Sequence, residues 1–187
     1  MTQKPTISAD HDITDLADAW DRCHRADWML WLCSVLGLLS DRERRLIACK
    51  VVRETPIGDG RTVWDLLTGE SRHAVVIAER YADGDATDKE LAAATADASD
   101  AAYAAASAVA RARATRSDAA DAAEVAAAMT AYVAALAAAK ATMSDAAYAA
   151  YAAATTAAYA ATADAAYAAQ ADIIREIAGN PFRDSDA

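Results

Sequence analysis

The second half of the chain is unusually rich in alanine, and this feature restricts the fold more than any other. Roughly half of the residues between Leu91 and Asp172 are alanine, and tyrosines are inserted among them in phrases such as DAAYAA. Alanine has the highest helix propensity because its side chain loses no rotamer entropy in a helix and does not compete for backbone hydrogen bonds. The composition therefore predicts long helices and an all-α fold.

Charged residues mark the expected ends of these long helices. Arginines precede Ser117 and aspartates follow it, and a similar change of sign occurs around Ser144. The helix macrodipole favours cations at the end of one helix and anions at the start of the next. We therefore expect three closely packed helices over residues 88–114, 118–141 and 145–178, or fewer if one helix continues through a predicted turn.

The first half of the chain carries the bulky residues, since all four tryptophans lie there. We expect its core to be formed by these large side chains, and we read the fold as a multi-helix bundle with a tryptophan-rich helical N-terminal subdomain. We expect residues 1–86 to form this part and residues 87–187 the Ala-rich bundle, with both in one continuous domain. Apolar spacing and helix-end signals predict helices at 12–24, 27–36, 40–55, 62–67 and 70–82, with a loop at 57–61.

Composition and charge argue against several classes of partner. The net charge is −10 and the sequence contains no basic patch, so binding to nucleic acid or to anionic lipid is not expected. The longest uncharged run, residues 146–163, is too rich in alanine and threonine to be a membrane span. Three cysteines and a start without an apolar signal region indicate reduced thiols and a cytoplasmic protein.

The sequence nominates no catalytic or metal centre. The cysteines and histidines match no metal-ligand spacing, and no nucleophile motif or phosphate-binding glycine loop is present. We therefore expect a non-enzymatic protein without metal or cofactor, in which cysteines are buried as small apolar residues and histidines lie at the surface. The residues considered were Cys23, Cys33, Cys49, His11, His24 and His73.

Two sets of residues are candidates for binding a protein partner. Acidic residues recur every three positions in the first predicted helix, where they either receive a basic partner or form a solvated helix face. Tyrosines share one face of the last predicted helix, where they either contact a partner or pack in the core. The candidates are Asp12, Asp15, Asp18 and Asp21 in the first set, and Tyr148, Tyr151 and Tyr159 in the second.

Two other classes of function remain open from the residues alone. The chain would act as a sponge for a nucleotide signal if arginines and tyrosines of different helices met in one pocket. The candidates for that pocket are Tyr103, Arg111, Arg113 and Tyr132. Alternatively, the Ala-rich helices would serve a structural role as an assembly unit or homo-oligomer.

Several segments resemble the immunity protein family of bacterial polymorphic-toxin systems and its phage-encoded relatives. The phrases ERYADG and GNPFR are the most specific of them, and members of the family often carry a bulky residue where Ala178 stands. The resemblance is carried by Trp28–Leu32, Arg44–Cys49, Val63–Leu67, Ser71–Gly84 and residues 173–183.

The resemblance implies an all-helical, non-enzymatic protein that binds and neutralises another protein, either a toxin or a defence effector. It supplies no catalytic residue. It also implies that Ser71, Arg72, Glu79 and Arg80 form a structural set of ion pairs rather than a site.

Overall fold

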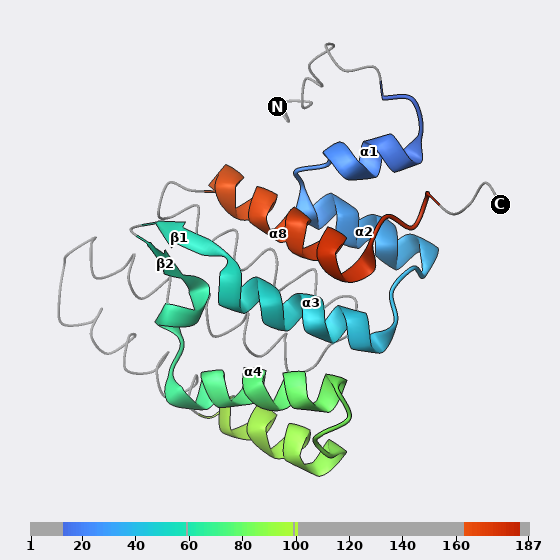
Figure 1. Cartoon of the computed structure of the whole chain (residues 1–187). Helices are drawn as coiled ribbons and strands as arrows, with labels where there is room; N and C mark the ends of the chain where they lie inside the picture. The colour runs from blue at the N-terminus through green and yellow to red at the C-terminus, as the bar shows by residue number, and fades with distance from the viewer. Residues whose placement is uncertain (1–12, 59, 99, 101–162, 184–187) are drawn as a thin grey trace, which may run out of the picture.

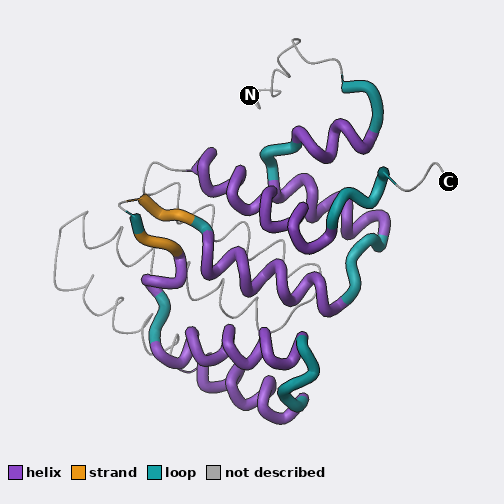
Figure 2. The backbone as a smooth tube through the Cα atoms, in the orientation of Figure 1, coloured by secondary structure: helices purple, strands orange, loops and turns teal. Residues whose placement is uncertain are grey.

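The computed structural model describes residues 13–58, 60–98, 100 and 163–183, and this part of the chain is almost entirely helical (Figures 1 and 2). The all-α, closely packed bundle predicted from the sequence is confirmed. Residues 88–98 are helical as well. The elements are α1 (Leu16–Arg22), α2 (Ala26–Leu36), α3 (Asp41–Glu54), β1 (Pro56–Gly58), β2 (Arg61–Thr62), the 3₁₀ helix η1 (Val63–Leu66), α4 (Gly69–Ala82) and α8 (Ala163–Ala178).

Local capping interactions explain where the helices begin. The Ser40 side chain accepts a hydrogen bond from the backbone of Glu43, whose carboxylate in turn accepts from the Ser40 backbone, so a capping box opens α3 near the predicted start of this helix. Thr87 and Glu90 make the same reciprocal pair. At the start of α1 the cap is Asp15, which accepts from the backbone of Asp18. The first helix is therefore shorter than the predicted range of residues 12–24.

The connection between α3 and α4 differs from its prediction. Residues 57–61 were expected to form a loop, but β1 and β2 pair there as a short antiparallel hairpin, with Pro56 opposite Thr62. The short helix that follows is a 3₁₀ helix. The helix α4 begins at Gly69, because the Thr68 side chain caps it by accepting a hydrogen bond from the backbone of Ser71.

The C-terminal helix α8 packs against helices that the first half of the chain forms. α8 packs against both α2 and α3, and α4 packs against α3 (Figure 1). Residues 88–98 add a further helix, whose Ala94 and Ala98 are buried against Ala74 and Ile77 of α4. The helix α8, which is more than 100 positions away from α2 and α3 in the sequence, thus completes the N-terminal core.

This core consists mainly of aliphatic side chains. Large side chains that are fully buried come from α2, α3 and α8, and each contributes roughly 1.5–3 kcal/mol on leaving water. The core includes Leu30, Ile47, Val51, Val52 and Ile174. Polar residues are buried as well, among them Gln170 of α8, which donates a hydrogen bond to the hydroxyl of the buried Thr55 at 3.2 Å.

Candidate functional site

A C-terminal clasp, formed by Arg175 and residues 179–183, holds α1 in place. The helix α1 has seven residues, and a helix of this length is not stable in water by itself. Its only fully buried residue is Trp20, whose indole Nε1 donates to the carbonyl of Gly179 at 2.9 Å. The Phe182 ring meets the Trp20 ring edge to face, with 5.8 Å between centroids.

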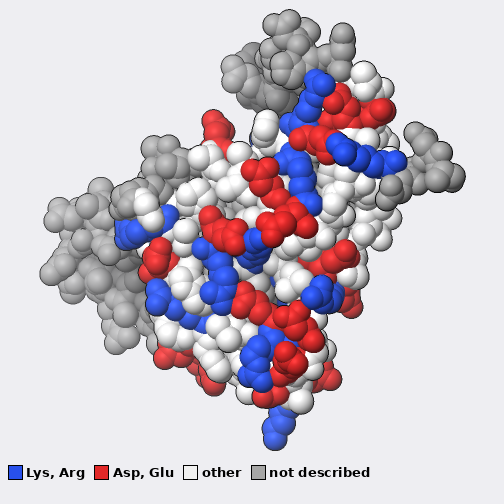
Figure 3. Space-filling model, viewed as in Figure 1, with Lys and Arg blue, Asp and Glu red and all other residues white. Residues whose placement is uncertain are grey.

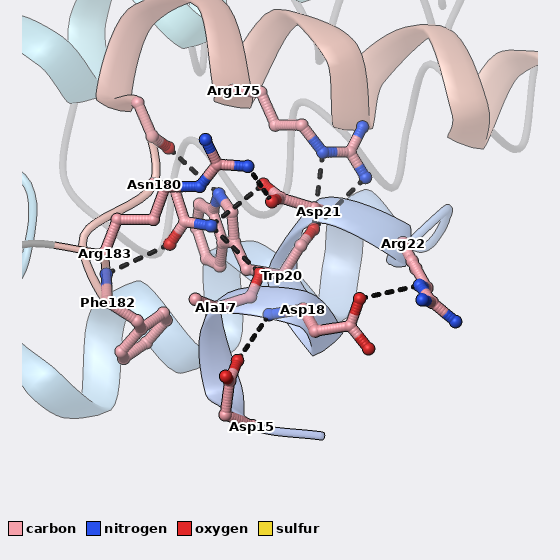
Figure 4. A network of polar contacts seen from close by, with 11 residues as sticks. Asp15, Ala17, Asp18, Trp20, Asp21, Arg22, Arg175, Asn180, Phe182 and Arg183 are labelled. Carbon is pink, nitrogen blue, oxygen red and sulfur yellow. Dashed lines mark hydrogen bonds and ion pairs between the residues drawn. The ribbon is translucent and has the colours of Figure 1, made fainter. Parts of the chain in front are cut away.

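Polar contacts complete the clasp (Figure 4). The Asn180 amide nitrogen donates to the carbonyl of Ala17 at 2.9 Å and to the carboxylate of Asp21 at 2.8 Å. Arg183 pairs with the other oxygen of Asp21 at 2.5 Å, and Arg175 donates to the carbonyl of Trp20. The GNPFR phrase is therefore a structural motif that fixes α1 to the end of α8.

The clasp and the helix cap use the acidic residues that we had considered for partner binding. Asp15 caps α1, and Asp18 forms an ion pair with Arg22 at 2.7 Å. Hydrogen bonds from Arg183 and Asn180 hold the pKa of Asp21 below its ordinary value. These three carboxylates thus have partners within the chain. Asp12 lies outside the described residues.

The other predicted site residues cannot be placed, because they lie outside the described part of the chain. They are the tyrosine candidates Tyr148, Tyr151 and Tyr159 and the pocket candidates Tyr103, Arg111, Arg113 and Tyr132.

Arginines also stabilise the region around α3 and α4, where both signs of charge are mixed over the surface (Figure 3). Arg53 binds Glu79 through two hydrogen bonds of 2.5 and 2.7 Å and lies 4.0 Å from the centre of the Trp64 ring. Arg72 donates to the carbonyl of Trp64, and Arg80 to a carbonyl of the following turn. The expected ion-pair set of Ser71, Arg72, Glu79 and Arg80 is wrong in composition, since Glu79 pairs with Arg53 of α3.

The cysteines have the character of core residues. Cys33 and Cys49 are buried and Cys23 is half-buried, and all three are free thiols. Burial raises the pKa of Cys33 to about 11 and that of Cys49 further, which keeps both thiols protonated. Among the described residues no group of three His, Cys, Asp or Glu side chains is placed to hold a metal ion.

The expectation that all tryptophans form the core is wrong for two of them. Four large apolar side chains of α2 are exposed, three of them on one side of the helix and the fourth at its C-terminal end, and we call this set the tryptophan face. It consists of Trp28, Trp31, Val35 and Leu36, whose exposed fractions are 49, 64, 61 and 50%. Ile13 and Leu16 near α1 are also exposed.

The periodicity of α2 explains this face. Trp28, Trp31 and Val35 follow the spacing i, i+3, i+7, which places them on one side of a helix. The buried residues Leu30 and Cys33 lie on the opposite side, toward the core that α8 completes. A helix that is apolar on two sides has a second face to bury, and the apolar residues that follow Asp27 with only Ser34 among them were the sequence signal for it.

The tryptophan face contains no charged residue, and a neighbouring arginine stacks on one of its rings. No charged residue occurs between Asp27 and Asp41. At its N-terminal edge the Arg25 guanidinium lies 5.1 Å from the centre of the Trp28 ring and 4.7 Å from that of Tyr167 of α8. Hydrogen bonds from Arg25 to Asp27 raise the pKa of the guanidinium, so this contact stays cationic.

The chain matches no protein-family model, no curated protein and no solved structure. Of the helices in the described ranges, none combines the length and hydrophobicity that crossing a bilayer requires.

Proposed function

We propose that this protein is a binding module that attaches to another protein through the tryptophan face of α2. The observation that carries the proposal is the exposure of two tryptophans side by side with Val35 and Leu36 on one helix. Single exposed apolar residues are common, but a contiguous set marks an interaction surface. Tryptophan is also among the residues most enriched at the energetic centres of protein interfaces.

The arrangement around the face supports this use. The stacking of Arg25 on Trp28 restricts that ring before any partner arrives, so less side-chain entropy is lost on binding. The charged residues Arg25 and Asp27 stand at the edge of the face rather than within it. A charge-free centre with a polar rim is the usual organisation of a protein interface. Because the centre of the face is apolar, we infer that the partner protein contacts α2 through apolar side chains.

The specific form of the proposal is a protein of immunity or counter-defence type, which neutralises a toxin or defence effector by covering its working surface. The resemblance of the ERYADG and GNPFR segments to immunity proteins of polymorphic-toxin systems supports this form. This protein needs no catalytic group for that role, because covering the working surface of the toxin or effector requires only that it bind at the right place with sufficient affinity.

The test is affinity purification of the tagged full-length chain from its native cells, in parallel with two variants. Trp31→Ala removes the most exposed side chain of the face, and Val76→Ala changes an exposed apolar residue on α4. We expect one protein to co-purify in near-stoichiometric amount with the wild type and with Val76→Ala, and to be lost with Trp31→Ala.

The recovered partner is then purified and titrated against the three chains by calorimetry. Truncating a central interface tryptophan is expected to weaken binding by about 2 kcal/mol or more. Recovery of no stoichiometric protein, or equal binding by Trp31→Ala and the wild type, would contradict the proposal.

A further inference from the structure

A second property of the tryptophan face concerns the protein when no other partner is present. We propose that two copies of this chain associate through α2, with the two helices antiparallel and related by a two-fold axis. The inference rests on the contact surface of the proposed function, but it concerns a different occupant, namely a second copy of the chain.

The first argument is the area available. The exposed fractions of Trp28, Trp31, Val35 and Leu36 correspond to roughly 450 Å² of side-chain surface per copy. Two copies would thus bury about 900 Å², which lies just below the range of stable specific interfaces and within that of weak ones. The area therefore fits a weak dimer that a better-matched partner can replace.

The second argument is the symmetry of the face. A two-fold interface places one patch against its own copy, so the patch must be complementary to itself. When two copies of α2 run antiparallel about the middle of the face, Trp28 of each copy lies opposite Val35 of the other. A large aromatic side chain then faces a small aliphatic one at both ends. A parallel pair would instead set Trp28 against Trp28 and Val35 against Val35.

The third argument is charge. The N-terminal edge of α2 carries Arg25 in an ion pair with Asp27, so this edge is close to neutral. Antiparallel pairing brings this neutral pair, rather than a single charge, toward the C-terminal end of the other α2. The net charge of −10 opposes association of whole molecules, but no acidic residue lies within the face itself.

Sedimentation velocity of the purified full-length chain tests the inference without any partner. We expect the weight-average sedimentation coefficient to rise from that of a monomer toward that of a dimer, with a Kd between about 10 µM and 1 mM. Val35→Lys places an ammonium group in the face and should raise the Kd at least roughly tenfold. Val76→Lys, the same change on α4, should leave the Kd unchanged.

The orientation is tested by a compensating change. When Trp28→Glu and Val35→Lys chains are mixed, the antiparallel arrangement sets the glutamate of one copy against the lysine of the other and keeps one Trp28–Val35 contact, so the mixture should associate more than either variant alone. A wild-type chain that stays monomeric through the millimolar range overturns the inference and leaves the face to a different protein. Equal loss of association in Val76→Lys, or no gain of association in the mixture, overturns it as well. None of these outcomes decides whether the co-purified partner of the proposed function exists.

Discussion

The pairing of Gln170 with Thr55 permits a quantitative test of how the core is held together. Both residues are fully buried, and the amide nitrogen of Gln170 donates to the Thr55 hydroxyl at 3.2 Å. The amide oxygen of Gln170 has no hydrogen-bond partner. Rotating the amide by 180° would exchange its oxygen and nitrogen, but one end would still lack a partner.

The expected free-energy changes follow from this asymmetry. A buried polar group without a partner costs about 1–3 kcal/mol, whereas a made hydrogen bond contributes about 1 kcal/mol net. The double variant Gln170→Met/Thr55→Val removes the unpaired atom together with the hydrogen bond while nearly conserving shape. We expect it to be more stable than the wild type by about 1–2 kcal/mol.

The single variants should behave differently. Thr55→Val leaves both ends of the Gln170 amide unpaired and should destabilise the protein by about 1–3 kcal/mol. Gln170→Met removes the unpaired oxygen but leaves the Thr55 hydroxyl without its partner, so these two effects should nearly cancel.

Equilibrium unfolding in urea, followed by circular dichroism and tryptophan fluorescence, measures all four chains. An unchanged m-value is the control that the same surface is exposed on unfolding. If the double variant were less stable than the wild type by more than about 1 kcal/mol, the amide oxygen would have a stabilising partner and the reasoning would be refuted.

Three further predictions concern the clasp and the thiols. Replacing Asn180 with alanine removes two hydrogen bonds to α1 and should lower the free energy of unfolding by about 1–3 kcal/mol, measured by urea unfolding. Because Arg183 lowers the folded-state pKa of Asp21, the stability that this pair contributes is present above the ordinary pKa of the carboxyl group and is lost as the pH falls through the lowered value. Unfolding measured across the acid range should therefore show a smaller loss for Asp21→Asn than for the wild type, and equal slopes would contradict this. Since burial raises the pKa of Cys33 to about 11, a thiol reagent at about pH 8 should label Cys23 first and Cys33 only on unfolding, which mass spectrometry detects.

Local signals predicted the helices of the first half closely. The Ser40–Glu43 capping box and the glycine after Leu36 act between residues a few positions apart, so the sequence contains all of the information that they need. The same holds for the end of α8 at Ala178, where Gly179 adopts a positive φ of 66° that glycine tolerates without strain. The hairpin was missed because its two short strands depend on pairing with each other and carry almost no periodicity.

The candidate interaction surface was only partly predictable. The predicted helix at 27–36 corresponds to α2, and its tryptophans were expected in the core, although the segment carries apolar residues on two sides. The sequence did not show which of them would be covered. α8 covers one face of α2, and the exposed residues Trp28 and Trp31 lie on the other.

The amino-acid sequence alone determined that the described part of this chain is helical and where its capped helices begin, since helix propensity and capping side chains act over a single turn. Only the tertiary structure decided that α8 enters the N-terminal core, that residues 179–183 hold α1, and that Asp21 serves the clasp. These contacts join positions more than 100 residues apart, and no local propensity encodes them. Their geometry depends on which apolar faces are buried against each other when the chain folds. The same packing leaves the tryptophan face at the surface.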